Sequence, residues 1–367
     1  MPTRNFFFLY KKIDWPLLIT VLILVIFGLA AIYTLTVNQE TQELTKFNRQ
    51  LIFFTIGILL VFIMAAIDYR IFQSYSFIFY LLGGLLLFLV MIFGTEIRGS
   101  TAWFSFYGQT FQPVEVAKIT LIIILSKYFS DHHAEMYDLK KIIISALILL
   151  PYLGMVLLQP DFGSAIILLI IWFGLLLMNK IRRVHIFAIL ACFVLLAVFS
   201  WFFVLQDYQQ ERITTFFNPS SDPLGSGYNP LQSIIAVGSG QFFGRGLGLG
   251  PQSQLNFLPL PEKDFIFAVI AEELGFVGSS LVLIFYIYLF WRLIKILREA
   301  TTNFSLFLLA GITIAIFSQV FINISTNIGL LPITGIPLPF LSYGGSSLII
   351  TLFMVGMVES VRLRQRL

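Results

Sequence analysis

The sequence predicts an all-α protein that crosses a membrane about ten times. Hydrophobic residues make up 58% of the 367-residue chain and charged residues only 11%, whereas an average soluble domain carries about 25% charged residues. Several apolar runs reach or approach the roughly 20 residues that span a bilayer. A soluble fold has no way to bury this much apolar surface, so the composition argues against a soluble cytosolic protein.

The predicted spans are joined by short connections over most of the chain. The first begins at Pro16 and ends without a small-residue cleavage site, which indicates a transmembrane helix rather than a signal peptide. The fourth is short and carries charge, and only residues 159–162 separate the fifth from the sixth, as in a tight turn or a re-entrant bend. The spans are 16–36, 50–67, 74–94, 113–128, 141–158, 163–179, 184–205, 265–291, 303–329 and 342–360.

Lysine and arginine predict the orientation. With the N-terminus inside, 16 of the 23 Lys and Arg residues fall in inner segments and 6 in outer ones, while Lys118 lies within a span. Cytoplasmic loops carry such an excess, and an even number of spans then places both termini in the cytoplasm. The net charge of +4 is scattered over short loops without a basic stripe, so we expect no nucleic-acid partner.

One outer loop, 206–264 between the seventh and eighth spans, is much longer than the others. It is rich in glycine and proline, and long ordered loops are commonly functional. The alternative is a flexible linker, but aromatic side chains imply packing. These aromatic residues are Phe216, Phe217, Tyr228, Phe242 and Phe243.

Three carboxylates mark the eighth span. Asp264 stands at its start, where the helix dipole stabilises an acid, so it is either a helix cap or a functional group. Glu272 and Glu273 follow within the apolar run, where a charge costs roughly 2.5–3.5 kcal/mol; they face a cavity or tie helices together. Asp264 and Glu272 are about 12 Å apart along a helix. That is too far for the paired carboxylates of a retaining sugar enzyme, about 5 Å apart, so any sugar chemistry favours Asp264 as a single base with inversion.

Polar residues also gather around the fourth span and before the sixth. Glu115 and Lys118 share one helix face, after Gln112 and a proline in the first helical turn. The pair suits capture of a phosphate group, or it is a buried ion pair that fixes helix packing. Asp161 is either a cap of the sixth helix or a second site residue.

The stretch 335–347 breaks the backbone before the tenth span. Irregular backbone at membrane depth persists only when it is buried in protein or lines a cavity. We therefore expect a polar cavity on the same side as Asp264. The residues that form it are Pro337, Pro339, Ser342, Tyr343, Gly344, Gly345, Ser346 and Ser347.

Disulfide and metal signals are weak. The single Cys192 lies in an apolar run and has no partner for a disulfide. The histidines, at 132, 133 and 185, lack metal-ligand spacing. The sequence therefore leaves the question of a metal open.

Four motifs resemble those of the SEDS family (shape, elongation, division and sporulation), in family order, within a match that runs from about Asp14 to the C-terminus. They are 111–118 (FQPVEVAK), 159–165 (QPDFGSA), 264–275 (DFIFAVIAEELG) and 335–347 (GIPLPFLSYGGSS). The resemblance implies one SEDS-type domain over 1–367 with ten membrane helices. The stretch 252–259 is similar to the elongation-type members, whereas division-type members usually carry lysine where Leu255 stands.

The resemblance implies peptidoglycan glycosyltransfer, the polymerisation of lipid II at the outer face of the bacterial cytoplasmic membrane. The family's essential aspartate aligns with Asp264, which would take the proton of the acceptor 4-hydroxyl. Cations would neutralise the diphosphate that leaves, with a divalent metal (Mg or Mn) as a possible aid. The implied substrate contacts are Lys118, Glu115, Gln112, Arg98, Arg212, Arg245, Lys263, Asp161 and Ser342.

The chain departs from the family pattern at three positions. Leu260 and Lys263 replace the family's glutamate and threonine, and Ala102 stands where an arginine is common. Lys263 either weakens Asp264 as a base or binds the diphosphate itself.

The resemblance also implies partners. They are a class B penicillin-binding protein, which cross-links the new glycan, and other membrane proteins of the elongation complex. The alternative function is a flippase for the lipid-linked precursor. A flippase needs polar residues along the whole crossing path, and their clustering on the outer side favours the enzyme.

Overall fold

Ten long helices account for the ten predicted spans. The computed structural model describes residues 12–37, 44–97, 99–106, 109–203, 207–217, 225, 227–255 and 257–365. Within these ranges the prediction of an all-α membrane protein is confirmed. The long helices are α2 (Trp15–Val37), α3 (Thr45–Ala66), α5 (Ser76–Phe93), α6 (Pro113–His132), α7 (Leu139–Leu158), α8 (Phe162–Leu177), α9 (Arg183–Phe203), α13 (Ile266–Arg298), α14 (Asn303–Asn327) and α15 (Gly345–Gln365).

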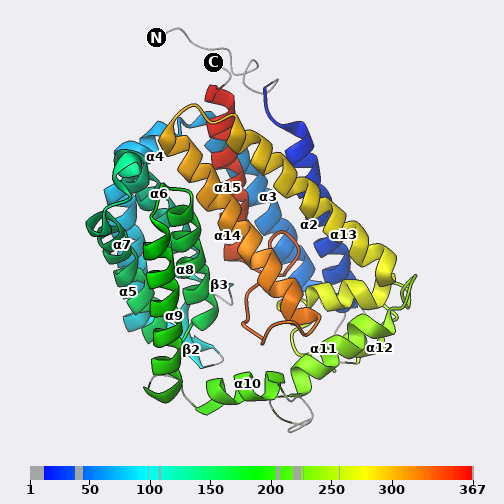
Figure 1. Ribbon diagram of the computed structural model, residues 1–367. Coiled ribbons are helices and arrows are strands. Elements are labelled where there is room, and N and C mark those ends of the chain that lie inside the picture. The colour runs from blue at the N-terminus through cyan, green and yellow to red at the C-terminus, as the bar shows by residue number, and fades with distance from the viewer. Residues whose placement is uncertain are drawn as a thin grey trace.

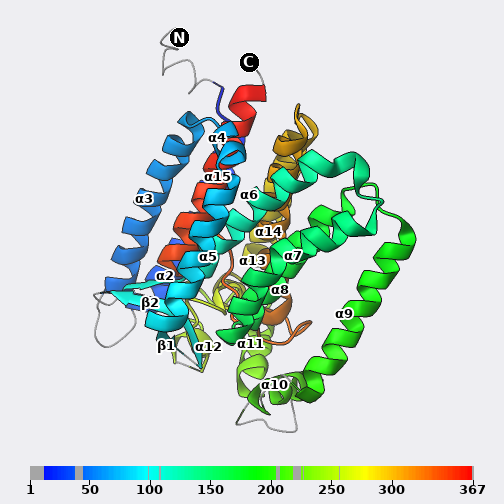
Figure 2. The same ribbon diagram turned by 90° about the vertical axis from the view of Figure 1, so that its left-hand side faces the viewer.

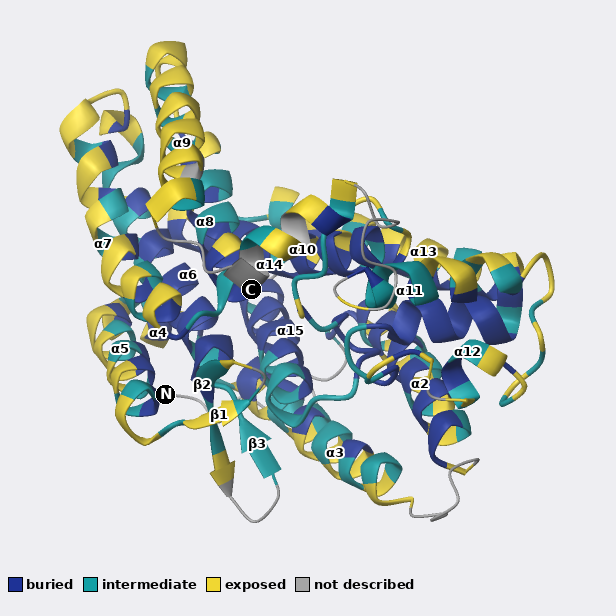
Figure 3. Cartoon of the chain, turned by 90° about the horizontal axis from the view of Figure 1, so that it is seen from below, coloured by how far each residue is buried: buried dark blue, intermediate teal, exposed yellow. Residues whose placement is uncertain are grey.

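Eight of these helices are long and apolar enough to cross a membrane, and α8 is a shorter apolar helix. The remaining helix, α6, carries charges, and it packs against α5, α8, α14 and α15. Because protein rather than lipid surrounds α6, the bundle shelters the charges that its sequence introduces. At the opposite extreme, α9 is exposed along its length and stands at the edge of the bundle (Figures 2 and 3), where lipid would cover it.

The connections gather at two ends of the bundle, and both ends of the described chain lie at the same one (Figure 1). We name the two ends after the predicted orientation. The inner end holds α4 (Arg70–Ser74), the 3₁₀ turn η1 (His133–Glu135) and residues 299–302. The outer end holds β1 (Thr95–Ile97), β2 (Ser100–Phe106), β3 (Gln109–Phe111), α10 (Asp207–Phe217), α11 (Tyr228–Ser239) and α12 (Pro251–Gln254).

The outer end contains structure that the sequence did not predict. The three strands form one antiparallel sheet in the order β1-β2-β3, and three helices lie within the predicted loop 206–264. Helix α11 packs on α13 and α14, with Ser233 and Ala236 buried. Among the loop's aromatic residues, Phe217, Phe242 and Phe243 remain 57–80% exposed, although the ring of Phe242 stacks on that of Phe276 with the centroids 5.8 Å apart.

The eighth predicted span, 265–291, is not one continuous helix. Gly275 has φ 67° and ψ −160° within α13, a region of backbone space that is essentially restricted to glycine. The short part 266–274 therefore runs across the direction of the long part 276–298 (Figure 1). Residues 272 and 273 lie at the end of the short part, next to the bend.

The irregular segment 328–344 enters the bundle. A β-carbon at Gly28, near the middle of α2, would lie 2.4 Å from the carbonyl oxygen of Leu341. Leu338, Phe340 and Leu341 are buried. Residues 336 and 338–342 are buried, whereas 328, 330 and 335 are exposed. The missing side chain at Gly28 makes the close approach possible, and the polar cavity expected along this segment stays a prediction.

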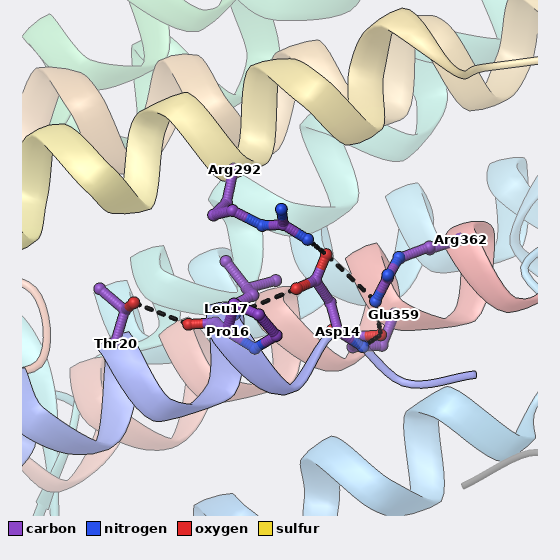
Figure 4. Close-up of polar contacts among 7 residues, drawn as sticks. All are labelled: Asp14, Pro16, Leu17, Thr20, Arg292, Glu359 and Arg362. Carbon is purple, nitrogen blue, oxygen red and sulfur yellow. Dashed lines mark hydrogen bonds and ion pairs between the residues drawn. The ribbon is translucent and has the colours of Figure 1, made fainter. Parts of the chain in front are cut away.

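Charged residues fasten three helices at the inner end (Figure 4). The backbone N–H of Asp14 donates to both carboxylate oxygens of Glu359, at 3.2 and 3.0 Å. The carboxylate of Asp14 contacts Arg292 of α13 and lies 3.1 Å from Arg362 of α15. Asp14 and Glu359 are fully buried, so these contacts join the start of α2 to α13 and α15 where water is excluded.

Replacing Asp14 by alanine should destabilise the protein strongly. The change leaves Arg362 buried with one carboxylate fewer, and removing one partner of a buried ion pair costs about 3–5 kcal/mol. Glu135→Ala is the control, because the Glu135–Lys141 pair at 3.0 Å is partly exposed and such pairs contribute about 0–1 kcal/mol. Thermal unfolding in detergent measures both. Equal melting temperatures for the two variants would contradict the role of Asp14 in joining α2 to α13 and α15.

Candidate active site

Asp264 lies in a turn at the outer end, before the helix that follows it. Helix α13 begins at Ile266, and Phe265 at its N-cap has the non-helical angles φ −113° and ψ 19°. The expectation that Asp264 occupies the first helical turn is therefore wrong. The backbone around Asp264 lies outside the helical hydrogen-bond ladder, so its polar groups need partners from other elements.

Segment 342–343 supplies donors for the two carbonyl groups before Asp264. The backbone N–H of Tyr343 donates to the carbonyl of Glu262 at 2.8 Å. The hydroxyl of Ser342 donates to the carbonyl of Lys263 at 2.6 Å and accepts from the N–H of Leu338 at 2.8 Å. Ser342, predicted as a substrate contact, is thus buried and occupied in holding the backbone next to Asp264.

The carbonyl of Asp264 itself accepts from two side chains of α14. The side-chain amides of Asn323 and Asn327 donate to it at 3.0 and 2.9 Å. Three consecutive carbonyl groups are therefore held from outside the segment. The sequence interpretation missed both asparagines, although two amides four residues apart in an apolar helix were a usable signal.

The first turns of α3 hold the other side of this backbone. The Nζ of Lys46 lies 2.7 Å from Oε1 of Glu262. One turn later the side chain of Gln50 donates to the carbonyl of Ser342 and accepts from the N–H of Gly344, both at 3.2 Å. The sequence interpretation missed Lys46 and Gln50 too, since nothing local marks them as neighbours of Asp264.

Asp161 caps α8, as one of the two interpretations of the sequence predicted. Its carboxylate accepts from the N–H and the hydroxyl of Ser164, at 3.0 and 2.7 Å. It also accepts from the side chain of Gln112 at 3.0 Å. Gln112 is the N-cap residue of α6 and Pro113 its first helical residue, so Asp161 joins the starts of two helices.

Glu115 and Lys118 form the ion pair that their spacing predicts. Their charged atoms lie 2.8 Å apart, and each side chain is at most 3% exposed. The pair is therefore closed off from solvent by the helices around α6.

The two groups of polar residues meet at the outer end. The Nζ of Lys263 lies 6.0 Å from the centre of the Trp103 ring. The pairing of β2 with β3 sets Phe104, next to Trp103, opposite Phe111, which precedes Gln112. The side chain of Asn323 also donates to the carbonyl of Ile336 at 2.8 Å. A β-carbon at Gly163 would lie 2.5 Å from the carbonyl of Thr334 and 3.1 Å from Ile336. Segment 334–336 thus contacts both groups, the Asp161 side at Gly163 and the Asp264 side through Asn323.

Glu272 fastens the glycine-rich loop to the short helix. Its carboxylate accepts from the backbone N–H groups of Gln252 and Ser253, at 2.8 and 3.0 Å, and it is fully buried. Its main-chain carbonyl accepts from the N–H of Arg245 at 2.9 Å.

Glu273 binds the same loop on its other side. Its carboxylate accepts from the N–H of Gly248 and the side chain of Gln254, both at 3.1 Å, and from Thr34 at 3.0 Å. Thr34 stands near the outer end of α2. The two glutamates therefore lie at the outer end, and the expectation of charges deep in an unbroken span is wrong because the helix bends at Gly275.

Other predicted site residues lie elsewhere or in structural contacts. Arg245 is held at the far end of the short helix from Asp264, so the structure does not bring the two together. Arg98 and the side chain of Arg212 lie outside the described residues. The carbonyl of Pro339 accepts from Tyr286. A β-carbon at Gly345 would meet the ring of Phe53 at 2.7 Å, and Pro337 lies in the irregular segment 328–344.

No metal cage is visible in the described part of the chain. No group of three or more His, Cys, Asp or Glu residues there is arranged to hold a metal ion.

Comparisons with known proteins agree on one family. Residues 14–367 match the family of cell cycle proteins FtsW, RodA and SpoVE. The peptidoglycan glycosyltransferase MrdB of Escherichia coli K12 is 33% identical over 369 residues, covering all of this chain and 98% of MrdB.

Solved structures agree with this match. A chain from a peptidoglycan synthase complex, described as coordinating polymerization and crosslinking, superposes with a TM-score of 0.81 at 30% identity, covering 96% of this chain and 98% of that one. The rod shape determining protein RodA of Thermus thermophilus superposes with a TM-score of 0.70 at 28% identity, covering 95% and 96%.

Replacing Gly275 by alanine should disrupt the outer end. A β-carbon there would lie 2.2 Å from the backbone nitrogen of Gly244, in addition to a backbone strain of about 1–3 kcal/mol. Gly99→Ala is the matched control, because Gly99 also has a positive φ but open space around it, and it should cost about 1–2 kcal/mol.

The measurements are thermal unfolding and limited proteolysis of the loop at 241–254. Faster cleavage is expected for the Gly275 variant alone, and its melting temperature should fall further than that of Gly99→Ala. Equal effects of the two substitutions would show that the close packing at the bend is unimportant.

Proposed function

The chain belongs to the family of cell cycle proteins FtsW, RodA and SpoVE, and on that premise we propose that it is a peptidoglycan glycosyltransferase of the bacterial cytoplasmic membrane. Glycosyltransferase activity fits its similarity to MrdB over the full length of both chains. A role in cell elongation fits the similarity to MrdB and RodA. Its substrate is lipid II, whose sugar is carried on a lipid diphosphate, and the reaction takes place at the outer end of the bundle.

Asp264 is the general base of this reaction. It takes the proton of the acceptor 4-hydroxyl as that oxygen bonds to the anomeric carbon of the donor. The bond between the anomeric carbon and the diphosphate breaks, and the electron pair leaves with the lipid diphosphate. One displacement at one carbon inverts its configuration and needs no second carboxylate as nucleophile.

The observation that carries this assignment is the difference among the four acids from 262 to 273. Glu262, Glu272 and Glu273 are at most 4% exposed, so their carboxylates are closed off from a substrate. Asp264 is partly exposed on a backbone that is fixed at three carbonyl groups. A general base needs both properties, because it must reach the substrate and stay in a defined position.

Lys263 is the cation that we assign to the leaving diphosphate. It is partly exposed beside Asp264 and Trp103. Lys46 stands on the same side, through its ion pair with Glu262. Lys118 is closed off with Glu115, so its role is to hold α6 in place rather than to meet the substrate directly.

The partner that we propose is a class B penicillin-binding protein, the transpeptidase that cross-links the glycan. Similarity to a chain of a peptidoglycan synthase complex supports such a partner. A flippase for the same precursor is the alternative, and the polymerisation assay below separates the two.

Replacing Asp264 by asparagine should abolish glycan polymerisation. The amide keeps the shape of the side chain but cannot accept the proton, and removal of a general base typically costs about 10²–10⁴-fold in rate. The measurement is polymerisation of purified lipid II with a penicillin-binding protein that cannot itself polymerise glycan. Asp161→Asn is the control, because Asp161 caps α8 and should change stability more than chemistry.

Wild-type polymerisation by the Asp264 variant would remove Asp264 from the reaction. No polymer from the wild-type protein, even with partner and divalent metal, would favour the flippase.

Replacing Lys263 by glutamine should slow the same reaction roughly 10- to 100-fold, because the developing charge on the diphosphate loses a cation. Lys263→Arg keeps the charge and should recover most of the rate. An unchanged rate in Lys263→Gln would place the diphosphate against another cation.

A further inference from the structure

Asn327 caps the short helix of α13 from a different helix. Its side-chain oxygen accepts from the N–H of Ala268, at 3.1 Å, in the first turn of α13. Its side-chain nitrogen donates to the carbonyl of Asp264 at 2.9 Å. The first N–H groups of a helix lack partners within it, and here one amide supplies a partner on each side of the point where the helix begins.

Asn323 reaches the same carbonyl from one turn earlier on α14. Its side-chain nitrogen donates to Asp264 at 3.0 Å and to the carbonyl of Ile336 at 2.8 Å. The nitrogen of Asn327 also lies 2.8 Å from the carbonyl of Asn323. Both amides therefore hold the proposed base, Asn327 also binds the turn of Asn323, and Asn323 also binds segment 334–336.

Because both asparagines are buried, their amide groups must keep these hydrogen-bond partners. Asn323 and Asn327 are at most 1% exposed within an apolar helix, where an unsatisfied amide costs several kcal/mol. The partners also fix which way each amide points, since only the nitrogen donates to a carbonyl. Rotation of the backbone at Asp264 would break both contacts to its carbonyl together.

We propose that Asn323 and Asn327 are positioning residues for the reaction, which set the direction of the Asp264 carboxylate by holding its backbone. This inference rests on the proposed function of Asp264 as the base. Neither amide needs to touch the substrate. Their removal should therefore lower kcat and leave KM nearly unchanged.

The test compares three single variants in the lipid II polymerisation assay, with the penicillin-binding partner present. Asn323→Ala removes one donor to Asp264 and one to Ile336, while the contact from Asn327 keeps the Asp264 carbonyl satisfied. Asn327→Asp keeps an acceptor for Ala268 but loses the donor to Asp264. Ser318→Ala is the control, since Ser318 is a buried residue of the same helix whose hydroxyl donates to Ala315.

We expect kcat to fall roughly 10- to 100-fold in both asparagine variants, because a displacement of about 1 Å costs up to about 10²-fold. The KM of both asparagine variants should stay within about twofold of the wild type, since neither asparagine touches the substrate. The Ser318→Ala control should keep both kcat and KM within the same range. Should Asn327→Asp fail to fold, the Asn323 variant decides alone.

Asp264→Asn, measured in parallel, distinguishes a failure of the positioning role from a failure of the proposed base. If it is inactive while both asparagine variants keep the wild-type kcat, the positioning role is overturned and the proposed base stands. A rise in KM at constant kcat also overturns it, in favour of substrate binding. If Asp264→Asn is active, the proposed base and the positioning role fall together.

Discussion

The candidate site depends on how the protein satisfies the backbone before α13. Residues 262–264 belong to no helix or strand, yet they lie against the apolar bundle, where unpaired carbonyl groups are costly. Tyr343, Ser342 and the two asparagines of α14 supply the missing donors. These contacts draw α14 and the segment before α15 toward one turn. The same contacts that satisfy the backbone also hold Asp264 still.

Glycine permits the second set of contacts, which hold the short helix from its other side. Gly244 and Gly275 both have positive φ, and their backbones approach each other more closely than any β-carbon would allow. Glu272 and Glu273 then accept the backbone N–H groups of the glycine-rich loop. The motif DFIFAVIAEELG thus combines two tasks: its aspartate is presented at the surface, and its glutamates and glycine fix the helix that carries it.

Features with a local cause were predictable from the sequence. The ten helices followed from apolar length, the Glu115–Lys118 pair from helical spacing, and the Asp161 cap from the residues beside it. Features that join distant segments were not: Asn323 and Asn327 are 59 and 63 residues from Asp264. The depth of Glu272 and Glu273 in the membrane was predicted wrongly because the prediction assumed a straight helix. The conformation of Gly275 turns residues 266–274 away from the direction of the rest of α13.

The position of the Asp264 carboxylate, fixed through its backbone, controls the reaction that we propose. The most direct test is the single-turnover rate of glycan bond formation in Asp264→Glu, which keeps the charge and the acid but adds one methylene group. On a rigid backbone the longer side chain misplaces the carboxylate by about 1 Å, and the rate should fall by up to about 10²-fold. A rate equal to that of the wild type would contradict the claim, because it would show that the carboxylate finds its own place.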